Sequence, residues 1–331
     1  DMRRVLHIGP CDTPGGMAKV MNILAENPPE GWEADLLSTH RTGNIILKWL
    51  AYRKAIKAFK RILLKQNDCP DLVHVHTAAD WSWRRKKRFI TLSKRFSIPC
   101  VIHIHSGKFE SWLKSPDSKI AIQTRTFINN TDSVVVVLSD EWKVRLKPYI
   151  GHSYVIHNPV DPNIIYNERI ERNKNNLLLM GRNDKVKGHN FAVKLGEGLA
   201  NSIPNFKLTM TGLEKSKYSW LEAKGWVSEQ EKLELLHKSS LLIVPSAYEG
   251  QPLTVLEALA CGLPCLVSNK VMGLPETVEY AEFGNITDWS NKVGDMLNKD
   301  IDLAGLISST EPYNINNIRQ KWKRFYDNLF D

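Results

Sequence analysis

Short apolar runs alternate along this chain with longer stretches in which apolar residues recur every three or four positions. Such runs are typical of strands in a buried parallel sheet, and the periodic stretches are typical of amphipathic helices. This order of strands and helices predicts an α/β fold built on parallel sheets. The predicted strands are residues 4–9, 34–39, 72–76, 101–105, 133–138, 176–180, 206–211, 241–244 and 263–268. The predicted helices include residues 17–25, 45–65, 229–237, 253–261 and 318–329.

The length of the chain suits two domains joined by a polar segment. A chain of 331 residues is long for one hydrophobic core. Residues 162–176 are polar and have the composition of a linker. We therefore predict Rossmann-like domains over residues 1–160 and 161–312, and a last helix within residues 313–331.

The composition is that of a globular cytoplasmic protein, with 42% hydrophobic and 24% charged residues. No stretch approaches the roughly 20 apolar residues that span a bilayer, and the sequence enters its first strand without the features of a signal peptide. The odd number and scattered positions of the cysteines predict reduced thiols, with neither a disulfide framework nor a zinc site. The five are Cys11, Cys69, Cys100, Cys261 and Cys265.

The net charge of +9 is concentrated in the first half of the chain. Residues 1–160 hold 25 Lys and Arg against 14 Asp and Glu, whereas residues 161–331 hold 20 against 22. Within the first half, residues 41–95 hold 15 basic and 3 acidic side chains. This asymmetry predicts that the first half faces a polyanion or an anionic membrane.

Two basic segments favour the membrane. Residues 45–65 predict a basic amphipathic helix that contains no acid, and such helices suit anionic lipid surfaces. From Trp81 to Phe89, five consecutive cations lie between aromatic residues that favour the headgroup layer. The alternatives are two ordinary helices with a solvated basic face, or nucleic-acid binding, for which the sequence has no recognisable module.

Two predicted strands each carry a His-x-His pair, whose members lie on one face because side chains alternate along a strand. The pairs are His74 with His76 and His103 with His105. Imidazole is a common metal ligand, but no carboxylate accompanies these histidines at ligand spacing, so we predict no metal. Active sites of α/β sheets lie at the carboxyl ends of strands. His105 ends its predicted strand and is the candidate site residue, with His103 as a packed or supporting neighbour.

Two loops have the chemistry to hold phosphate. Gly15 and Gly16 separate the first strand from the first helix, where a helix N-terminus binds anions, although the full dinucleotide fingerprint is missing. Arg182 and Lys187 lie in a second glycine-bounded loop, where cations can neutralise the growing charge of a leaving diphosphate. The alternative is a pair of turn glycines and two solvated cations.

The most informative stretch is residues 241–269, which predicts a strand, a loop, a helix and a second strand. Glu249 lies in the loop and Glu257 in the helix. Gly250 permits close approach of the backbone to a ligand, and the free amides of a helix that begins at Leu253 favour an anion. One unit therefore carries two carboxylates and a phosphate-binding helix end.

This unit resembles the donor-site motif of family-4 retaining glycosyltransferases, whose GT-B fold has two Rossmann-like domains with parallel sheets facing across a cleft. The motif stands here as Glu249-Gly250-Gln251-Pro252 through Glu257 to Cys261-Gly262-Leu263-Pro264. The pair Gly15-Gly16, His105 and the Arg182–Lys187 spacing resemble family features in the same order, although Ser106 separates His105 from Gly107. In such proteins the final helix commonly crosses back onto the first domain.

The resemblance implies a role for each matching residue. Arg182 and Lys187 would stabilise the leaving diphosphate, Glu249 would bind the sugar, and His105 would position sugar and acceptor. Glu257 would bind the ribose. The donor-binding residues would be Gly15, Gly16, Arg182, Lys187, Gly250, Pro252, Leu253, Thr254 and Glu257.

The sequence therefore predicts a retaining hexosyltransferase of polysaccharide biosynthesis, bound peripherally at the inner face of the membrane. A UDP- or GDP-sugar would be its substrate rather than a cofactor, and a lipid-linked or membrane-associated glycan would accept the sugar. No strand-end Asp-x-Asp is present, so we predict no catalytic metal. The alternatives are an epimerase or phosphorylase on the same fold, or a catalytically silent partner subunit.

Overall fold

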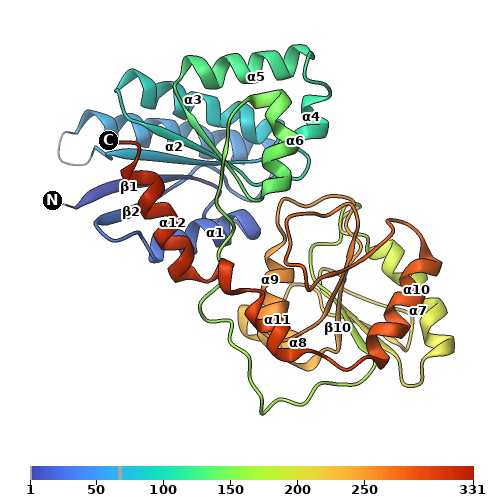
Figure 1. Ribbon diagram of the computed structural model, residues 1–331. Helices are drawn as coiled ribbons and strands as arrows, with labels where there is room; N and C mark the ends of the chain where they lie inside the picture. Colours follow the sequence, from blue (N-terminus) through green and yellow to red (C-terminus); the bar gives the residue numbers. More distant parts are fainter. Residues whose placement is uncertain (1, 66–68) are drawn as a thin grey trace. The chain divides into compact units, whose positions relative to one another are not determined.

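The computed structural model describes residues 2–65 and 69–331 (Figure 1). The chain forms two compact units. Unit 1 comprises Asp1–Pro159 and Ile315–Asp331, and unit 2 comprises Val160–Asn314. Each unit is a parallel sheet covered by helices, so the predicted α/β fold with parallel sheets is confirmed.

Unit 1 is built on a six-stranded parallel sheet in the order β2-β1-β3-β4-β5-β6. Its strands are β1 (Arg3–Gly9), β2 (Trp32–Ser38), β3 (Leu72–Thr77), β4 (Cys100–Ile104), β5 (Val134–Val137) and β6 (Tyr154–Val155). β1, β3 and β4 are neighbours in the middle of the sheet. Their register aligns His7 with His74 and His76 with His103, which brings histidines of three strands together.

Seven helices of the described residues belong to unit 1: α1 (Gly16–Glu26), α2 (Ile45–Leu64), α3 (Trp81–Arg95), α4 (Phe109–Leu113), α5 (Lys119–Asn130), α6 (Asp140–Ile150) and α12 (Ile315–Asp327). The last of these, α12, packs Trp322 and Tyr326 against the histidine-bearing strands. Tyr326 also lies 5.0 Å from Trp32, between ring centroids. The C-terminal helix therefore completes the core of unit 1.

The basic segments predicted from the sequence form α2 and α3. Phe59 and Leu63 of α2 are buried, whereas Leu47 and Leu50 of the same apolar pattern are exposed. The five cations of α3 do not all face outward, because consecutive residues of a helix point all around its axis. Lys86 is 2% exposed, so the prediction of an exposed basic face was wrong for this residue.

Unit 2 is built on a second six-stranded parallel sheet, in the order β12-β11-β10-β7-β8-β9. Its strands are β7 (Asn176–Leu179), β8 (Lys207–Met210), β9 (Leu221–Ala223), β10 (Leu241–Val244), β11 (Cys265–Ser268) and β12 (Glu279–Ala281). Its helices are α7 (His189–Ser202), α8 (Glu229–Lys238), α9 (Leu253–Ala260), α10 (Ile286–Asn298) and α11 (Leu303–Ser308), followed by the short 3₁₀ helix η1 (Glu311–Tyr313). Two apolar clusters form the core of unit 2.

Element boundaries differ from the predicted ones by a few residues. Strand β4 ends at Ile104, so His105 directly follows the strand instead of ending it. Helix α9 ends at Ala260 and Gly262 adopts φ +67°, which is the left-handed conformation that commonly stops a helix. All five cysteines are free thiols, as predicted. Among the described residues, no helix combines the length and apolar character needed to cross a bilayer.

Candidate functional site

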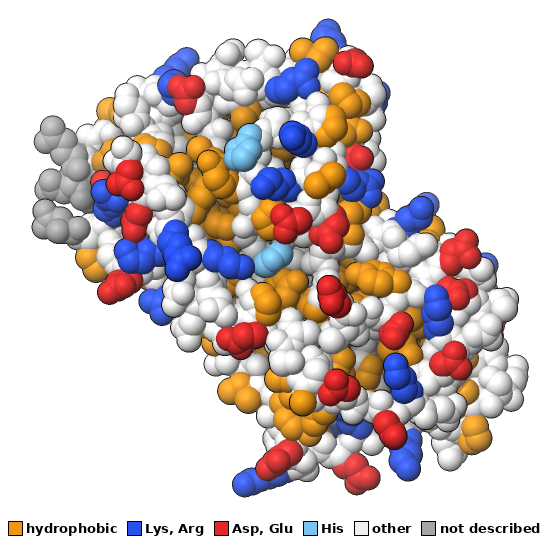
Figure 2. All heavy atoms as spheres, viewed as in Figure 1, with side chains coloured by type: hydrophobic (Ala, Val, Ile, Leu, Met, Phe, Trp, Pro, Cys, Tyr) orange, Lys and Arg blue, Asp and Glu red, His pale blue; other side chains and the backbone are white. Residues whose placement is uncertain are grey.

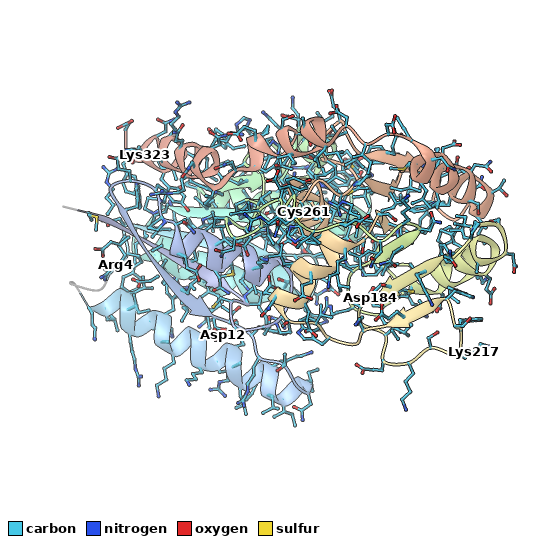
Figure 3. All side chains as sticks on the ribbon, turned by 90° about the horizontal axis from the view of Figure 1, so that it is seen from below. Arg4, Asp12, Asp184, Lys217, Cys261 and Lys323 are labelled. Carbon is cyan, nitrogen blue, oxygen red and sulfur yellow. The ribbon has the colours of Figure 1, made fainter. Side chains whose placement is uncertain are left out.

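The loop after β7 carries Arg182 and Lys187 and is held by hydrogen bonds at both ends. The Gly181 amide donates to Thr211 Oγ1 at 2.8 Å. Asp184 Oδ1 accepts from the amides of Val186 and Lys187, both at 3.0 Å (Asp184 is labelled in Figure 3). These hydrogen bonds fix the backbone that carries Arg182 and Lys187, and the Arg182 side chain is exposed to solvent.

A glycine brings this loop against the residue that follows β10. Gly188 has φ +78°, and a Cβ there would lie 2.7 Å from the carbonyl oxygen of Pro245. A second contact, from the Ala247 amide to the Val186 carbonyl, measures 2.9 Å. The two loops after β7 and β10 are thus joined, at the carboxyl edge where parallel sheets carry their ligands.

Lys187 and Glu249 meet at this junction. Lys187 Nζ lies 2.6 Å from Glu249 Oε1, and Ser246 Oγ donates to the same oxygen at 2.9 Å. The side chains are 25% and 15% exposed, respectively, so a ligand can still reach them. The structure therefore joins a predicted phosphate-binding cation to a predicted sugar-binding carboxylate.

Helix α9 begins directly after the Glu249 loop. Its N-cap is Pro252, no side chain caps it, and no acid lies in its first turn, which begins with Leu253 and Thr254. A helix start without capping side chains or acids favours an anion. Gln251 Nε2 donates to the Gly273 carbonyl at 2.7 Å in a buried position, and this bond fixes the loop that leads into the helix.

Glu257 forms a separate, buried ion pair. Its side chain is 2% exposed, and Oε1 accepts from Lys232 Nζ at 3.0 Å. Lys232 of α8 also contacts Glu229 at 2.6 Å. Sequence reasoning missed Lys232, because no motif spacing links a lysine of α8 to a carboxylate of α9.

Five histidines of unit 1 form a network of two hydrogen-bonded chains, which are in contact through the stacked rings of His74 and His76 at 4.2 Å between centroids. One branch runs from His7 Nδ1 to His76 Nε2 at 2.9 Å and from His76 Nδ1 to His105 Nε2 at 2.9 Å. The other branch links His103 Nδ1 to His74 Nε2 at 3.1 Å and His74 Nδ1 to the Tyr326 hydroxyl at 2.6 Å. His105, the predicted site residue, is thus the partly exposed end of a buried chain.

Burial keeps these imidazoles neutral. It lowers the pKa of His7 and of His105 to about 3, and it lowers the pKa of His103 well below the ordinary value. Two sets of three ring nitrogens, one from each histidine, lie within 4.8 Å of one another, a spacing at which a metal ion could bind. Hydrogen bonds account for most of the ring nitrogens of the five histidines, whereas His103 Nε2 is buried and makes no hydrogen bond with the described residues.

Sequence reasoning missed His7. A signal was available, because His7 is a polar residue within a predicted buried strand, as are the histidines of the two His-x-His pairs. The pairing of β1 beside β3 could not be deduced from the sequence alone.

The glycine pair lies where the sequence predicts it. Gly15 is the N-cap of α1 with φ +147°, and Gly16 is the first helical residue. A Cβ at Gly15 would meet no atom within 4 Å, so the backbone conformation rather than crowding requires this glycine. The first turn of α1 contains no acid, which again suits an anion.

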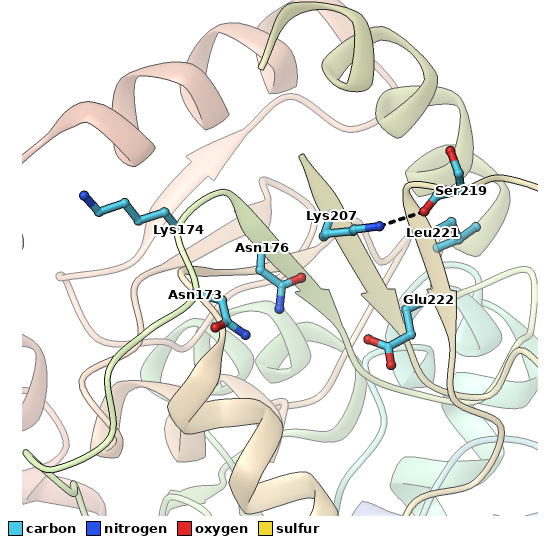
Figure 4. Close-up of a pocket in the computed structure, with 7 residues that line it drawn as sticks. All are labelled: Asn173, Lys174, Asn176, Lys207, Ser219, Leu221 and Glu222. Carbon is cyan, nitrogen blue, oxygen red and sulfur yellow. Dashed lines mark hydrogen bonds between the residues drawn. The ribbon is translucent and has the colours of Figure 1, made fainter. Parts of the chain in front are cut away.

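The cavity of about 450 Å³ in unit 2 lies at the other edge of its sheet (Figure 4). Asn176 and Lys207, which begin β7 and β8, line it, and Lys207 Nζ donates to the Ser219 carbonyl at 2.8 Å. Because ligands of parallel sheets bind at the carboxyl ends of the strands, this cavity is separate from the candidate site.

Family models match both halves of the chain. The model described as Glycosyltransferase Family 4 matches residues 22–164, and the one described as Glycosyl transferases group 1 matches residues 161–307. A glycogen synthase from Mycobacterium tuberculosis is 26% identical over 269 residues, which cover 73% of this chain. The matched segment is 63% of that enzyme, so the chain spans less than two thirds of this relative.

Solved structures share the fold. Sucrose-phosphate synthase from Thermosynechococcus elongatus superposes with a TM-score of 0.75 at 17% identity, over 99% of both chains. The pneumococcal O-GlcNAc transferase GtfA, solved with UDP and GlcNAc, has a TM-score of 0.63 at 13% identity. That match covers 83% of this chain and 59% of GtfA.

Proposed function

Because this chain belongs to the family-4 glycosyltransferases with the GT-B fold, we propose that it transfers a sugar from a nucleotide-diphosphate sugar to a hydroxyl group with retention of configuration. The observation that carries the proposal is the contact between Lys187 and Glu249, at the carboxyl edge of the unit 2 sheet. The two groups are chemically suited to the two parts of the donor, its diphosphate and its sugar. The UDP in the GtfA structure supports a nucleotide donor.

Lys187 and Glu249 would exchange partners when the donor binds. The ammonium of Lys187 would turn from the carboxylate to the diphosphate, and Arg182 on the same loop would provide a forked second contact. Glu249 would then accept hydrogen bonds from sugar hydroxyls near the anomeric carbon. Since two cations neutralise the leaving group in this scheme, we propose that no divalent metal takes part.

Helix α9 would complete the donor site. The amides of Leu253 and Thr254 would face the diphosphate, with Gly250 and Pro252 shaping the turn before them. Glu257 would accept from the ribose hydroxyls, and its bond to Lys232 would hold the carboxylate in place. In unit 1, we propose that His105 contacts sugar or acceptor and that the amides near Gly15 and Gly16 bind phosphate.

The acceptor would be a lipid-linked or membrane-associated glycan, and this part of the proposal rests on α2. The first turns of this helix leave Ile45 81% and Trp49 51% exposed, and Arg53 stacks over Trp49 at 4.7 Å. In Figure 3 the pale blue α2 lies along the lower edge, and many of its side chains point away from the sheet. Exposed apolar groups flanked by cations suit an anionic lipid surface. We therefore propose that the enzyme binds at the inner face of the membrane.

The test is binding and turnover of a panel of UDP- and GDP-sugars, with anionic liposomes present and absent. We expect one donor to be hydrolysed slowly by the unaltered protein, and hydrolysis to be lost in Lys187→Ala and Glu249→Ala. Hydrolysis should persist in EDTA, and loss of activity there would contradict the metal-free scheme. If no donor binds under any condition, the proposal is wrong.

A further inference from the structure

A lysine in the interior of unit 1 has no acidic partner among the residues that the structure describes. Lys86 of α3 is 2% exposed, and its Nζ donates to Thr39 Oγ1 at 2.9 Å. An ammonium group has three N–H donors. Thr39 provides the one hydrogen bond that Nζ makes with the described residues, and no described carboxylate lies within ion-pair distance of it.

The chain neighbours of Lys86 and Thr39, Arg85 and His40, each have a buried nitrogen that makes no hydrogen bond with the described residues. These nitrogens are Arg85 Nε and His40 Nδ1. Burial, followed by the charges of Arg85, Lys48 and Lys86, lowers the pKa of His40. His40 directly follows Thr39, the residue that Lys86 contacts. Burial and then the charge of Arg85 lower the pKa of Lys86 to about 7, and Cys11 opposes the shift.

A buried positive charge without a counter-charge is unfavourable, because desolvation is not offset by an ion pair. Proteins retain such groups where a ligand supplies the missing charge. Here the groups without a full set of partners are the Arg85 Nε–H, the Lys86 ammonium and the His40 Nδ1, which donates in one of the two neutral tautomers. A tetrahedral anion with several acceptor oxygens matches this set, and Arg and Lys are the usual partners of phosphate.

We propose that Lys86, Arg85 and His40 form a binding site for a phosphate group, and that this phosphate belongs to the acceptor substrate. The assignment to the acceptor rests on the proposed transferase function, whereas phosphate binding itself does not.

The place of the cluster in the fold supports this assignment. Thr39 directly follows β2, and its amide donates to the Gly9 carbonyl at the end of β1, at 2.9 Å. The cluster therefore lies at the carboxyl edge of the sheet, where ligands bind. Lys48 belongs to the first turns of α2, whose neighbouring Ile45 and Trp49 are exposed. A phosphate site beside exposed apolar side chains suits an amphiphilic phosphate ester.

The first experiment measures thermal unfolding and calorimetric binding with inorganic phosphate, against sodium chloride at equal ionic strength. We expect phosphate to raise the melting temperature of the unaltered protein. Lys86→Met should weaken phosphate binding by about 10-fold or more, because it removes a charged hydrogen bond. The free Lys86→Met protein should be at least as stable as the unaltered one, since the buried charge is gone, so loss of binding cannot be ascribed to unfolding.

The matched control is Lys87→Met, which makes the same substitution one residue along the helix. Lys87 Nζ lies over the Phe127 ring at 4.5 Å from the centroid and is not part of the cluster. Phosphate binding within about twofold of the unaltered value is expected for this variant, because only long-range charge is lost. Equal weakening in the two variants, or no stabilisation by phosphate at matched ionic strength, would overturn the proposal.

A second arm identifies the source of the phosphate. Vesicles of phosphatidylcholine with and without phosphatidic acid distinguish a lipid phosphate from a soluble ester. Lys86-dependent binding to the phosphatidic acid vesicles assigns the site to a lipid phosphate, and Lys86-dependent binding of inorganic phosphate alone assigns it to a soluble ester. UDP and GDP binding is measured in parallel, with Lys187→Ala as reference. If inorganic phosphate does not stabilise the protein but UDP or GDP binds, this inference alone is refuted. If phosphate stabilises the protein but neither nucleotide binds, the proposed function alone is refuted.

Discussion

Each of the two units has its own six-stranded parallel sheet, but the units differ in how their buried and half-buried cations are paired. In unit 2, the cations Lys187 and Lys232 each contact a carboxylate, at 2.6 and 3.0 Å. In unit 1, Lys86 contacts a hydroxyl, and Arg85 Nε has no partner among the described residues. Figure 2 shows acidic and basic side chains interspersed over the region of α10 and α11 in unit 2.

This difference indicates two ways of receiving an anion. In unit 2 the proposed donor would displace the Glu249 carboxylate from Lys187, so binding would exchange one ion pair for another and keep the charge balance. In unit 1 a ligand would supply a counter-charge that the protein lacks. The net charge of the sequence follows the same division, because its excess of cations lies in residues 1–160.

The largest expected effect concerns the paired cation of unit 2. Lys187→Ala should lower kcat/KM for donor hydrolysis by about 100- to 1,000-fold, the usual loss when one stabilising donor to a developing charge is removed. Lys185→Ala removes an exposed cation from the same loop and should change the rate by less than about threefold. Similar losses in both variants would show that general electrostatics, rather than the Glu249-bound lysine, governs the rate.

The histidine network of unit 1 should make its stability depend on acid. The pKa of His7 is about 3 in the folded state, below the ordinary value, so the unfolded chain takes up the proton first as the pH falls. His7 alone should therefore remove about 2 kcal/mol of unfolding free energy between pH 6.5 and 5. Denaturant unfolding at the two pH values measures the change.

The other buried histidines should add to this acid sensitivity. His7→Leu should reduce the slope of the unfolding free energy against pH by one proton. Equal unfolding free energies at pH 6.5 and 5 would contradict neutral, buried imidazoles.

The glycine that joins the two loops of unit 2 should resist substitution. Gly188→Ala would strain a left-handed backbone and press a Cβ against the Pro245 carbonyl, which should destabilise the protein by about 1–3 kcal/mol. Gly198→Ala in the exposed interior of α7 meets no atom and should stabilise it by about 0.5–1 kcal/mol. Thermal unfolding of the two variants tests these opposite signs, and a neutral Gly188→Ala would contradict the close approach.

The smallest expected effect concerns helix α2, the proposed membrane contact. Lys54→Ala on α2 should weaken binding to anionic liposomes by about 1 kcal/mol, roughly fivefold. Lys147→Ala on α6 removes an equally exposed cation and should have little effect. Liposome sedimentation compares them, and equal weakening by both would show that α2 is not a specific docking surface.

The sequence could predict elements and motif positions, but not contacts across strands and loops. Hydrophobic runs located the strands because a parallel sheet buries both faces. The donor-site motif singled out Glu249, and the Arg182–Lys187 spacing singled out Lys187. The contact between Lys187 and Glu249 depends on two loops that Gly188 allows to touch. Their assigned roles on the donor stay predictions.

The misses have the same physical origin. His7 joins the histidine network because β1 pairs with β3, and strand order is not written in any local pattern. Lys86 is buried because helix α3 must turn one residue of its cationic run toward the sheet, and the run alone does not say which. A single sequence thus locates charged residues more readily than it locates their partners.

The central claim is retaining transfer from a nucleotide-diphosphate sugar. A proton NMR time course of the protein with the donor that it hydrolyses tests this claim most directly, since it follows both the nucleotide and the anomeric proton. We predict release of the nucleoside diphosphate and an initial sugar product with the anomeric configuration of the donor. An initial product of inverted configuration, or release of a sugar phosphate in place of the nucleoside diphosphate, would contradict the account.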